Sequence, residues 1–197
     1  MNKIFLLMGK SASGKDAIYR NLLTNDKLHL RKVVMYTTRP KRGGETEGVQ
    51  YFFRTEQEYA FLKKSGKIIE EREYLTELGS WHYFTADDAQ IDLEAGSYLM
   101  IGTLDVFHAL CNHFGRGSVV PIYIDVDDHN LLTRAMKREA KQDCPHYDEM
   151  CRRFLADRKD FAKEKMQKAG IKRVFANNGK LEKTIQEIST YITQQSN

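Results

Sequence analysis

The chain has 197 residues, of which 41% are hydrophobic and 29% charged, and its formal net charge is +4 at pH 7. This is the composition of a globular protein long enough to bury a full core. No apolar run approaches membrane-spanning length, the first three residues leave no room for a signal peptide, and the charge is too small to indicate nucleic acid by itself. We therefore expect a cytoplasmic protein with no membrane or nucleic-acid partner.

The three cysteines, Cys111, Cys144 and Cys151, are odd in number and match no zinc or redox spacing. Reduced thiols are the expectation for such a set.

Strand and helix patterns alternate along the chain, which predicts an α/β fold with a mostly parallel sheet flanked by helices. Strands are predicted at 3–8, 32–36, 97–101, 119–124 and 172–176, and helices at 15–23, 87–94, 105–114, 127–141, 148–169 and 181–192. Between them, short strands at 51–53, 67–71 and 81–85 surround a helix at 55–64 that begins with a capping box. The sequence thus predicts one domain at 1–197, with a core at 1–35 and 86–197 and a strand-rich arm at 36–85.

A glycine loop follows the first predicted strand. Gly9, Gly14 and Lys15 have the spacing Gly, four residues, Gly-Lys that is typical of a phosphate-binding loop. Glycines let backbone N–H groups curl around phosphate oxygens, and the next helix adds partial positive charge at its N-terminus. Lys15 can then reach the β- and γ-phosphates. We expect ATP at Gly9, Lys10, Ser11, Ala12, Ser13, Gly14, Lys15 and Asp16.

Asp16 stands where such loops normally carry the Ser or Thr that ligates Mg²⁺. A carboxylate is also a hard oxygen ligand, and a negative side chain is tolerated at a helix N-terminus. Asp16 is therefore expected to hold Mg²⁺, directly or through water.

A longer motif spans residues 37–53, which read TTRPKRGGETEGVQYFF. This segment resembles the acceptor-binding arm of guanylate kinases. The resemblance implies that Arg39, Arg42 and Tyr51 hold the phosphate of the acceptor GMP, a task suited to forked guanidinium groups and a phenolic hydroxyl.

The resemblance continues at residues 68–70, which read IIE, and at 83–85, which read YFT. It implies that Glu70 accepts from the guanine N1–H and amino group, that Tyr83 contacts the phosphate and that Thr85 contacts the base. Thr103 stands among the residues that replace the paired acids of the fourth strand, and it is assigned to the same acceptor site.

The resemblance also implies a helical lid at about 135–153. Arg134 and Arg138 lie four residues apart on one helix face, and Arg153 follows in the next helix. By the resemblance these arginines close over the triphosphate and join Lys15 as catalytic residues. Residues 174–177 resemble the family's closing strand, which implies that Asn177 lies near adenine.

Three departures leave the acceptor open. The Gly-Lys-Asp ending of the loop also occurs in ribose 1,5-bisphosphate phosphokinases, and the fourth strand lacks the family's paired aspartates. Met35 stands where guanylate kinases usually have a serine near the base. The expected reaction is Mg²⁺- and ATP-dependent phosphorylation of GMP or dGMP by a monomer or homodimer. The alternatives are a kinase for another phosphorylated acceptor, such as ribose 1,5-bisphosphate, and a nucleotide-binding regulator that has lost efficient catalysis.

Overall fold

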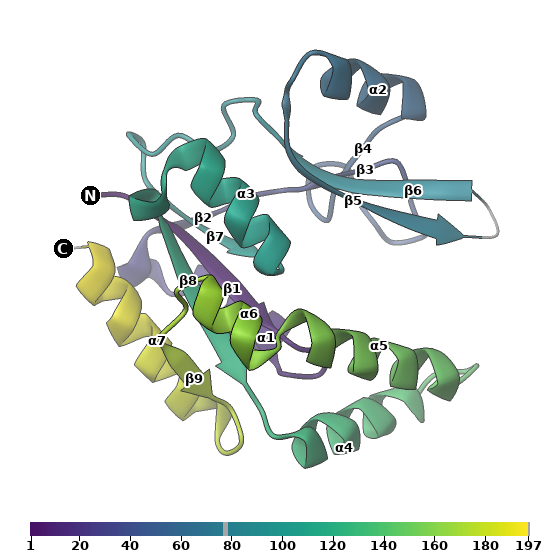
Figure 1. Cartoon of the computed structure of the whole chain (residues 1–197), viewed down its shortest axis with the longest axis vertical. Helices are drawn as coiled ribbons and strands as arrows, with labels where there is room; N and C mark the ends of the chain where they lie inside the picture. The colour runs from purple at the N-terminus through teal and green to yellow at the C-terminus, as the bar shows by residue number, and fades with distance from the viewer. Residues whose placement is uncertain (77–78, 197) are drawn as a thin grey trace.

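The computed structural model describes residues 1–76 and 79–196. In this part of the chain, a five-stranded sheet of order β2-β7-β1-β8-β9 forms the centre, and its neighbouring strands all pair in parallel (Figure 1). The strands are β1 (Ile4–Gly9), β2 (Leu30–Lys32), β7 (Ser97–Ile101), β8 (Val119–Asp125) and β9 (Val174–Ala176). The predicted α/β fold with a mostly parallel sheet flanked by helices is confirmed.

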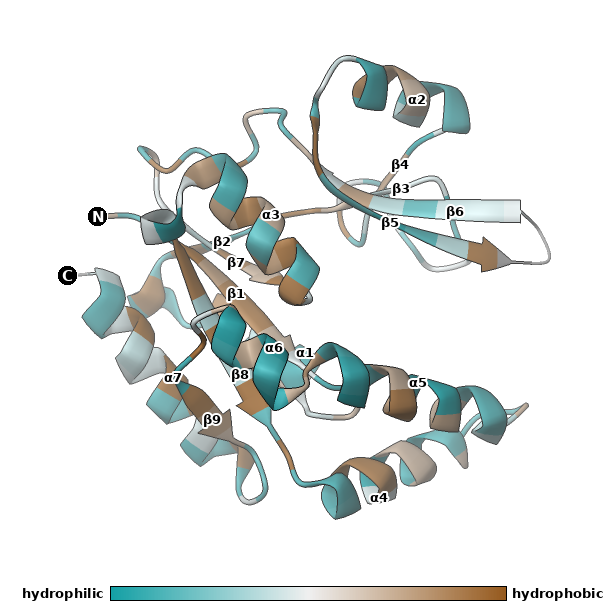
Figure 2. Cartoon of the chain, in the orientation of Figure 1, coloured by the Kyte–Doolittle hydropathy of each residue, from teal (hydrophilic) through white to brown (hydrophobic). Residues whose placement is uncertain are grey.

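Helices cover both faces of this sheet, and its middle strand β1 is apolar and buried along its whole length (Figure 2). Because successive side chains of a strand point to opposite faces, Leu6 of β1 packs with α3 and α6, whereas Leu7 packs with α1 and α7. The helices are α1 (Lys15–Leu23), α3 (Leu104–Phe114), α6 (Lys163–Lys168) and α7 (Leu181–Ser196), with 3-10 turns at η1 (Asp26–Leu28) and η2 (Arg116–Ser118).

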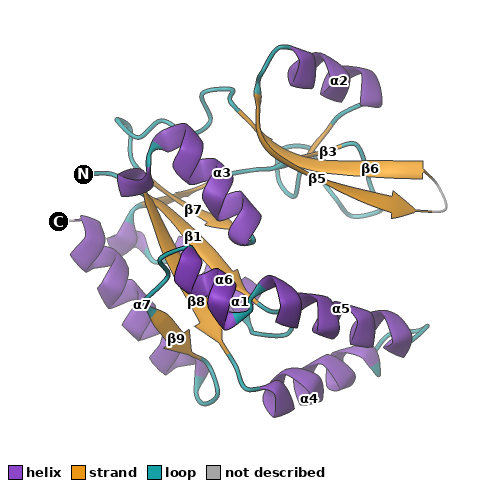
Figure 3. Cartoon of the chain, viewed as in Figure 1, coloured by secondary structure: helices purple, strands orange, loops and turns teal. Residues whose placement is uncertain are grey.

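A second sheet of order β4-β3-β6-β5 stands apart from the central one (Figure 3). It comprises β3 (Tyr36–Thr37), β4 (Phe52–Phe53), β5 (Ile68–Thr76) and β6 (Gly79–Ala86), and α2 (Glu56–Lys64) packs on it. Tyr59 of α2 lies in a small apolar core with Tyr36 and Phe84, and the predicted capping box at Thr55 and Glu58 is present. We call residues 36–86 the arm.

Two helices, α4 (Asp128–Glu139) and α5 (Tyr147–Asp160), form a hairpin that projects on the same side of the molecule as the arm (Figure 1). The Asp127 side chain accepts from the backbone N–H of Asn130 and caps the start of α4. At the far end, the Glu139 carboxylate accepts from the backbone N–H of His146 at 2.7 Å. This bond fixes the link between the two helices.

The predicted strand at 32–36 is wrong. The strand β2 ends at Lys32 and β3 begins at Tyr36 in the other sheet. Between them, the side-chain amide of Gln90 bonds both the N–H and the carbonyl of Val34. A side chain therefore takes the place of a neighbouring strand at the point where the chain passes between the sheets.

The predicted helix at 87–94 is also wrong, because this segment consists of turns. The Asp88 carboxylate accepts from the N–H of Gln90, and the Tyr98 hydroxyl accepts from the N–H of Asp92. Ala89 has φ +65°, outside the right-handed helical region. Side chains thus satisfy the backbone groups that a helix would have paired.

The predicted helix at 148–169 is interrupted between α5 and α6. Ala162 is extended, and the Phe161 ring is buried with its centroid 5.3 Å from that of Tyr123. The helix thus breaks at the point where this ring packs against the central sheet. The strands predicted at 67–71 and 81–85 exist and are longer than expected.

Within the described ranges, no helix combines the length and the apolar character that a membrane span requires.

Candidate functional site

The loop of residues 9–16 joins β1 to α1 at the carboxyl end of the central strand, where parallel α/β sheets place their ligands. A Cβ atom on Gly9 would lie 2.9 Å from the Ile124 carbonyl oxygen. Gly14 has φ +87°, and a Cβ there would lie 2.7 Å from the Asn177 side-chain amide. Gly9 is therefore required by the close approach of the Ile124 backbone, and Gly14 by its left-handed conformation and by the Asn177 side-chain amide beside it.

Asn177, which follows β9, braces this loop. Its side-chain amide donates to the Ser13 carbonyl at 2.9 Å, and its carbonyl accepts from Arg134 of α4 at 2.8 Å. Only 3% of Asn177 is exposed. Asn177 thus joins the loop, β9 and α4. Its predicted contact with adenine stays a prediction.

The hairpin also touches the loop through ionic groups. The Asp157 carboxylate of α5 accepts from the Ser11 backbone N–H at 2.5 Å, and the Lys10 ammonium lies 3.3 Å from Asp128. Asp128 in turn lies 3.6 Å from Arg158. Sequence reasoning missed Asp157, because one acid in a highly charged helix gives no signal. Its position shows that the loop N–H of Ser11 is available to an anion.

Lys15 and Asp16 stand at the start of α1, where Gly14 is the N-cap and no side chain caps the helix. Neither side chain has a hydrogen bond or ion pair with another described residue. The loop therefore presents a cation and a carboxylate beside the positive end of a helix.

The donor set around Asp16 fits a magnesium ion that is held mainly by phosphates and water. Residues 1–76 and 79–196 contain no cluster of three His, Cys, Asp or Glu side chains that could form a protein cage for a metal. Asp16 is exposed and its carboxylate oxygens are unpartnered in that part of the chain. Mg²⁺ is commonly bound by one or two carboxylates together with substrate phosphates, and Asp16 could supply such a ligand.

Arg39 is the central residue of a polar cluster in the arm. Its guanidinium makes two bonds to the Glu45 carboxylate, at 2.7 and 3.0 Å, and Nε donates to the Tyr83 hydroxyl at 3.2 Å. The Arg39 guanidinium and the Arg42 backbone N–H hold the pKa of Glu45 at about 2. Arg39 is 3% exposed, so Glu45 stands where an anionic ligand would otherwise meet a buried guanidinium.

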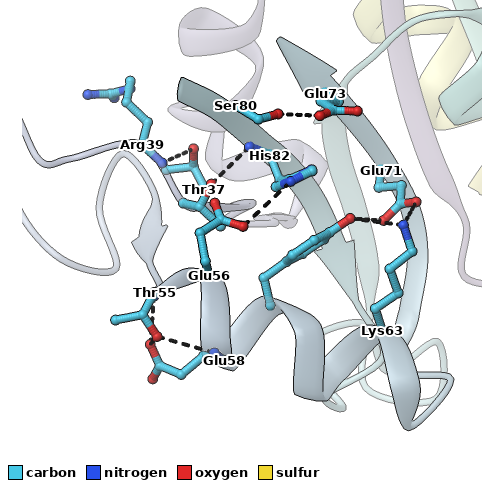
Figure 4. A network of polar contacts seen from close by, with 12 residues as sticks. Thr37, Arg39, Thr55, Glu56, Glu58, Lys63, Glu71, Glu73, Ser80 and His82 are labelled. Atoms are coloured by element: carbon cyan, nitrogen blue, oxygen red, sulfur yellow. Dashed lines mark hydrogen bonds and ion pairs between the residues drawn. The ribbon is translucent and has the colours of Figure 1, made fainter. Parts of the chain in front are cut away.

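Threonine hydroxyls hold the backbone at and beside Arg39. The Arg39 N–H donates to the Thr37 hydroxyl, and on the neighbouring strand the His82 N–H donates to Thr38. Figure 4 shows the Arg39 side chain extending away from the network that joins α2 to β5 and β6. In that network, Lys63 and Tyr59 both bond the Glu71 carboxylate. This packing leaves the guanidinium on the opposite side of the sheet from α2.

Tyr51 and Arg42 lie beside this group. The Tyr51 ring packs edge-on against Tyr83 with centroids 5.5 Å apart, and the Arg39 guanidinium lies 5.6 Å from its centroid. Burial raises the pKa of the Tyr51 phenol, so its hydroxyl remains a neutral donor. The Arg42 side chain is exposed, with no ionic partner in the described ranges. The structure therefore brings together Arg39, Tyr51 and Tyr83, with Arg42 at the edge.

Glu70 and Thr85 face each other across the β5–β6 ladder. The Thr85 hydroxyl donates to the Glu70 carboxylate at 2.8 Å, and both residues are buried. Burial raises the pKa of Glu70, and the Arg72 guanidinium, 3.4 Å away, opposes that rise. Sequence reasoning missed Arg72, although its place two residues along the same strand face was a signal.

Thr103 is the N-cap of α3, with its hydroxyl accepting from the Val106 N–H. It lines a cavity of about 330 Å³ that also meets Arg72 and Tyr74 of β5 and Lys165 of α6. The residue thus lies where the arm meets the central layer, on the same cavity as Arg72.

The three predicted lid arginines differ in their surroundings. Arg134 bonds the Asn177 carbonyl and so lies near the phosphate loop. Arg138, one turn further on, is exposed. The Arg153 Nε lies 3.5 Å from Glu149 of its own helix. The structure does not bring these three guanidinium groups together on one ligand position.

Comparison with known proteins gives one family. The guanylate kinase family model matches residues 1–195. A guanylate kinase from Mesorhizobium japonicum is 44% identical over 138 residues, which cover 70% of this chain and 62% of that relative. One from Mycoplasma mobile is 36% identical over 95 residues, covering 48% and 45% of the two chains. The matched segments thus span less than two thirds of these relatives.

A crystal structure of guanylate kinase from Anaplasma phagocytophilum is similar with a TM-score of 0.64, covering 98% of this chain and 86% of that one at 22% identity. This likeness describes the fold. The match over residues 1–195 covers nearly the whole chain, and the chain therefore belongs to the guanylate kinase family.

Proposed function

We propose that this chain transfers the γ-phosphoryl group of ATP to the phosphate of GMP or dGMP, giving ADP and GDP or dGDP. The observation that carries the proposal lies on β6. The Tyr83 hydroxyl accepts from the buried Arg39, and Thr85, two residues along the same strand face, bonds the buried Glu70. One strand face thus joins a site for a phosphate to a carboxylate that can read a base.

In the acceptor site, Arg39, Arg42, Tyr51 and Tyr83 hold the GMP phosphate, with the phosphate replacing Glu45 on the Arg39 fork. Glu70 accepts from the guanine N1–H and amino group, supported by Thr85, and Thr103 lies at the side of the base. A carboxylate can accept from two adjacent N–H donors as it does from arginine.

In the donor site, ATP phosphates lie in the loop of residues 9–16 against its backbone N–H groups. Lys15 reaches the transferring phosphoryl group and neutralises its charge, and Asn177 keeps the loop in shape. Asp16 would supply a carboxylate ligand to Mg²⁺, and the bound ion would neutralise phosphate charge.

Transfer is in line. An oxygen of the GMP phosphate forms a bond to the γ-phosphorus while the bond to the β,γ-bridging oxygen breaks and ADP leaves. No side-chain nucleophile is needed because the acceptor phosphate is already ionised. Closure of the α4–α5 hairpin brings Arg134, Arg138 and Arg153 to the phosphates and excludes water. Residues 135–153 are the moving lid.

The proposed partners are small nucleotides alone, and the protein acts as a monomer or homodimer in the cytoplasm. The location rests on the number and spacing of the cysteines, which suit reduced thiols.

The test is ADP formation from ATP with GMP, dGMP, AMP or ribose 1,5-bisphosphate as acceptor. GMP and dGMP should give rapid ADP release, and AMP and the sugar bisphosphate should not. Lys15→Ala, purified in parallel, controls for contaminating kinases. Turnover with ribose 1,5-bisphosphate but not with GMP would replace the proposed acceptor, and nucleotide binding with no transfer to any acceptor would make the chain a binding protein.

A further inference from the structure

Arg72 is a partly buried cation with unused hydrogen-bond donors. Its Nε lies 3.4 Å from the Glu70 carboxylate, yet this N–H is shielded from solvent and makes no hydrogen bond to any residue of the described ranges. Its Nη2 contacts the Met35 sulfur at 3.4 Å. A thioether is a weak acceptor, and a buried donor without a good partner costs free energy. The guanidinium is therefore poorly satisfied by the protein itself.

This guanidinium also borders open space. Arg72 lines the cavity of about 330 Å³ between β5 and α3, opposite Thr103. Glu70, its neighbour on the strand face, is 8% exposed. A ligand in this cavity therefore meets the Arg72 guanidinium, which lies 3.4 Å from the Glu70 carboxylate.

We propose that Arg72 determines base specificity by donating to O6 of guanine while Glu70 accepts from N1–H and the 2-amino group. The proposal rests on the proposed function and names a residue that reads the same acceptor. Guanine presents an acceptor, a donor and a donor in a row along this edge. The pair of Arg72 and Glu70 presents a donor followed by two acceptors, which is the complementary order.

Adenine reverses two of these groups. Its 6-amino group is a donor that would face the donors of Arg72, and its N1 is an acceptor that would face the carboxylate of Glu70. Arg72 thereby adds a repulsive contact against the wrong base to the attractive one for guanine. Met35, which packs against the guanidinium, keeps it on this edge.

The experiment measures calorimetric dissociation constants of GMP, IMP and 2,6-diaminopurine ribonucleoside monophosphate for wild type, Arg72→Met and Arg54→Met. IMP lacks only the 2-amino group, whereas the diaminopurine nucleotide replaces O6 by an amino group and N1–H by a bare nitrogen. Arg54 is the matched control, because it lies in the arm and pairs with Glu47. Denaturant unfolding of each variant checks that the arm is folded.

In Arg72→Met, the preference for GMP over the diaminopurine nucleotide should fall by about tenfold or more, as expected for loss of a specific arginine contact to a base. The preference for GMP over IMP should stay, because Glu70 still reads the amino group. Arg54→Met should keep both preferences. If Arg72→Met is unfolded, Arg72→Lys serves instead, since it keeps the charge near Glu70 and lacks the planar fork.

An unchanged preference against diaminopurine would overturn the assignment. A parallel loss of both preferences would also overturn it, because Arg72 would then act only by keeping Glu70 ionised. A wild type that does not bind GMP would refute the proposed function itself, and this result is distinct from both.

Discussion

The side-chain amide of Asn177 donates to the backbone carbonyl of Ser13 at 2.9 Å, across 164 residues of sequence. This bond fixes the phosphate loop to the strand β9, and Gly14 has no Cβ because that amide lies where one would stand. The shape of the loop therefore depends on a residue near the other end of the chain.

Asn177→Ala should leave the buried Ser13 carbonyl without its donor. We expect a loss of about 1–3 kcal/mol in the free energy of unfolding, together with weaker ATP binding. Denaturant unfolding and calorimetric ATP titration measure the two effects. Asn178→Ala is the matched control, because Asn178 accepts from the Asp127 N–H in an exposed position. Equal effects of the two substitutions would argue against a special role of Asn177 in the loop.

Lys15→Ala should reduce phosphoryl transfer to GMP by at least about a hundredfold, since the proposal gives Lys15 the task of neutralising transition-state charge. Stability should change little, because Lys15 has no ionic partner in the described part of the chain. Steady-state ADP release and thermal unfolding test both statements. Lys183→Ala, which removes an exposed lysine of α7, should be neutral in both assays. Near-normal turnover of Lys15→Ala would end its catalytic assignment.

Arg39→Ala and Arg42→Ala should both weaken GMP binding, each by roughly 1.5–3 kcal/mol for a charge-assisted contact, with ATP affinity nearly unchanged. They should differ in stability. Arg39 is buried, and its loss leaves the Glu45 carboxylate without its ion-pair partner, whereas the Arg42 side chain is exposed. Calorimetry with each nucleotide and unfolding curves separate these effects, and Arg54→Ala is the arm control. Equal losses for GMP and ATP would remove these arginines from the acceptor site.

Sequence patterns predicted the strands β1, β7 and β8 and the glycine turn after β1 well because their signals are local. A buried parallel strand is a continuous apolar run, and the loop has a fixed glycine spacing. The helix wrongly predicted at 87–94 shows the limit of such reasoning. Its backbone is held by the Tyr98 hydroxyl and, through Val34, by the Gln90 side chain. These are tertiary contacts that no local pattern encodes.

The site shows the same division. The resemblance at residues 37–53 indicated Arg39 and that at 83–85 indicated Tyr83, and the structure brings the two side chains into contact. The importance of Arg72 depends on what surrounds it, namely a buried Glu70, a thioether and a cavity. Asp157 contacts the loop of residues 9–16 only because the fold brings the last turn of α5 to Ser11. Pairings between distant helices and strands are set by the fold, so the sequence alone could not reveal them.

Acid should loosen the arm through Glu45. Its folded pKa of about 2 lies below the ordinary value of 4.5, so the stability that it contributes is present above pH 4.5 and is lost as the pH falls toward 2. Trp81, the single tryptophan of the chain, lies on β6 of the arm, and its fluorescence reports this change. Glu45→Gln should flatten the stability profile in this window, whereas Glu187→Gln on α7 should leave it unaltered. If the stability of Glu45→Gln depends on pH as that of the wild type does, the ion pair of Arg39 with Glu45 does not stabilise the arm.

Asp16 offers the sharpest test of how the loop holds its metal. If the carboxylate replaces the usual hydroxyl as a ligand of Mg²⁺, Asp16→Ser should keep or raise GMP phosphorylation, because it restores an oxygen at the same helix position. Asp16→Ala removes that oxygen and should weaken ATP binding only when Mg²⁺ is present. ATP affinity by calorimetry and ADP release are therefore measured for both variants across an Mg²⁺ titration. Asp26→Ala, which removes an acid from η1, controls for the change in net charge.

The comparison of the two Asp16 variants shows whether or not Asp16 ligates Mg²⁺. A ligand role predicts that Asp16→Ala needs more Mg²⁺ to reach the wild-type ATP affinity, and that Asp16→Ser does not. Identical Mg²⁺ dependence of wild type, Asp16→Ala and Asp26→Ala would show that Asp16 does not ligate the ion. The carboxylate is exposed and has no partner among the residues described, so neither substitution should disturb the packing of α1. A change in Mg²⁺ dependence can then be attributed to the metal shell, since the loop glycines and the Asn177 brace remain in place.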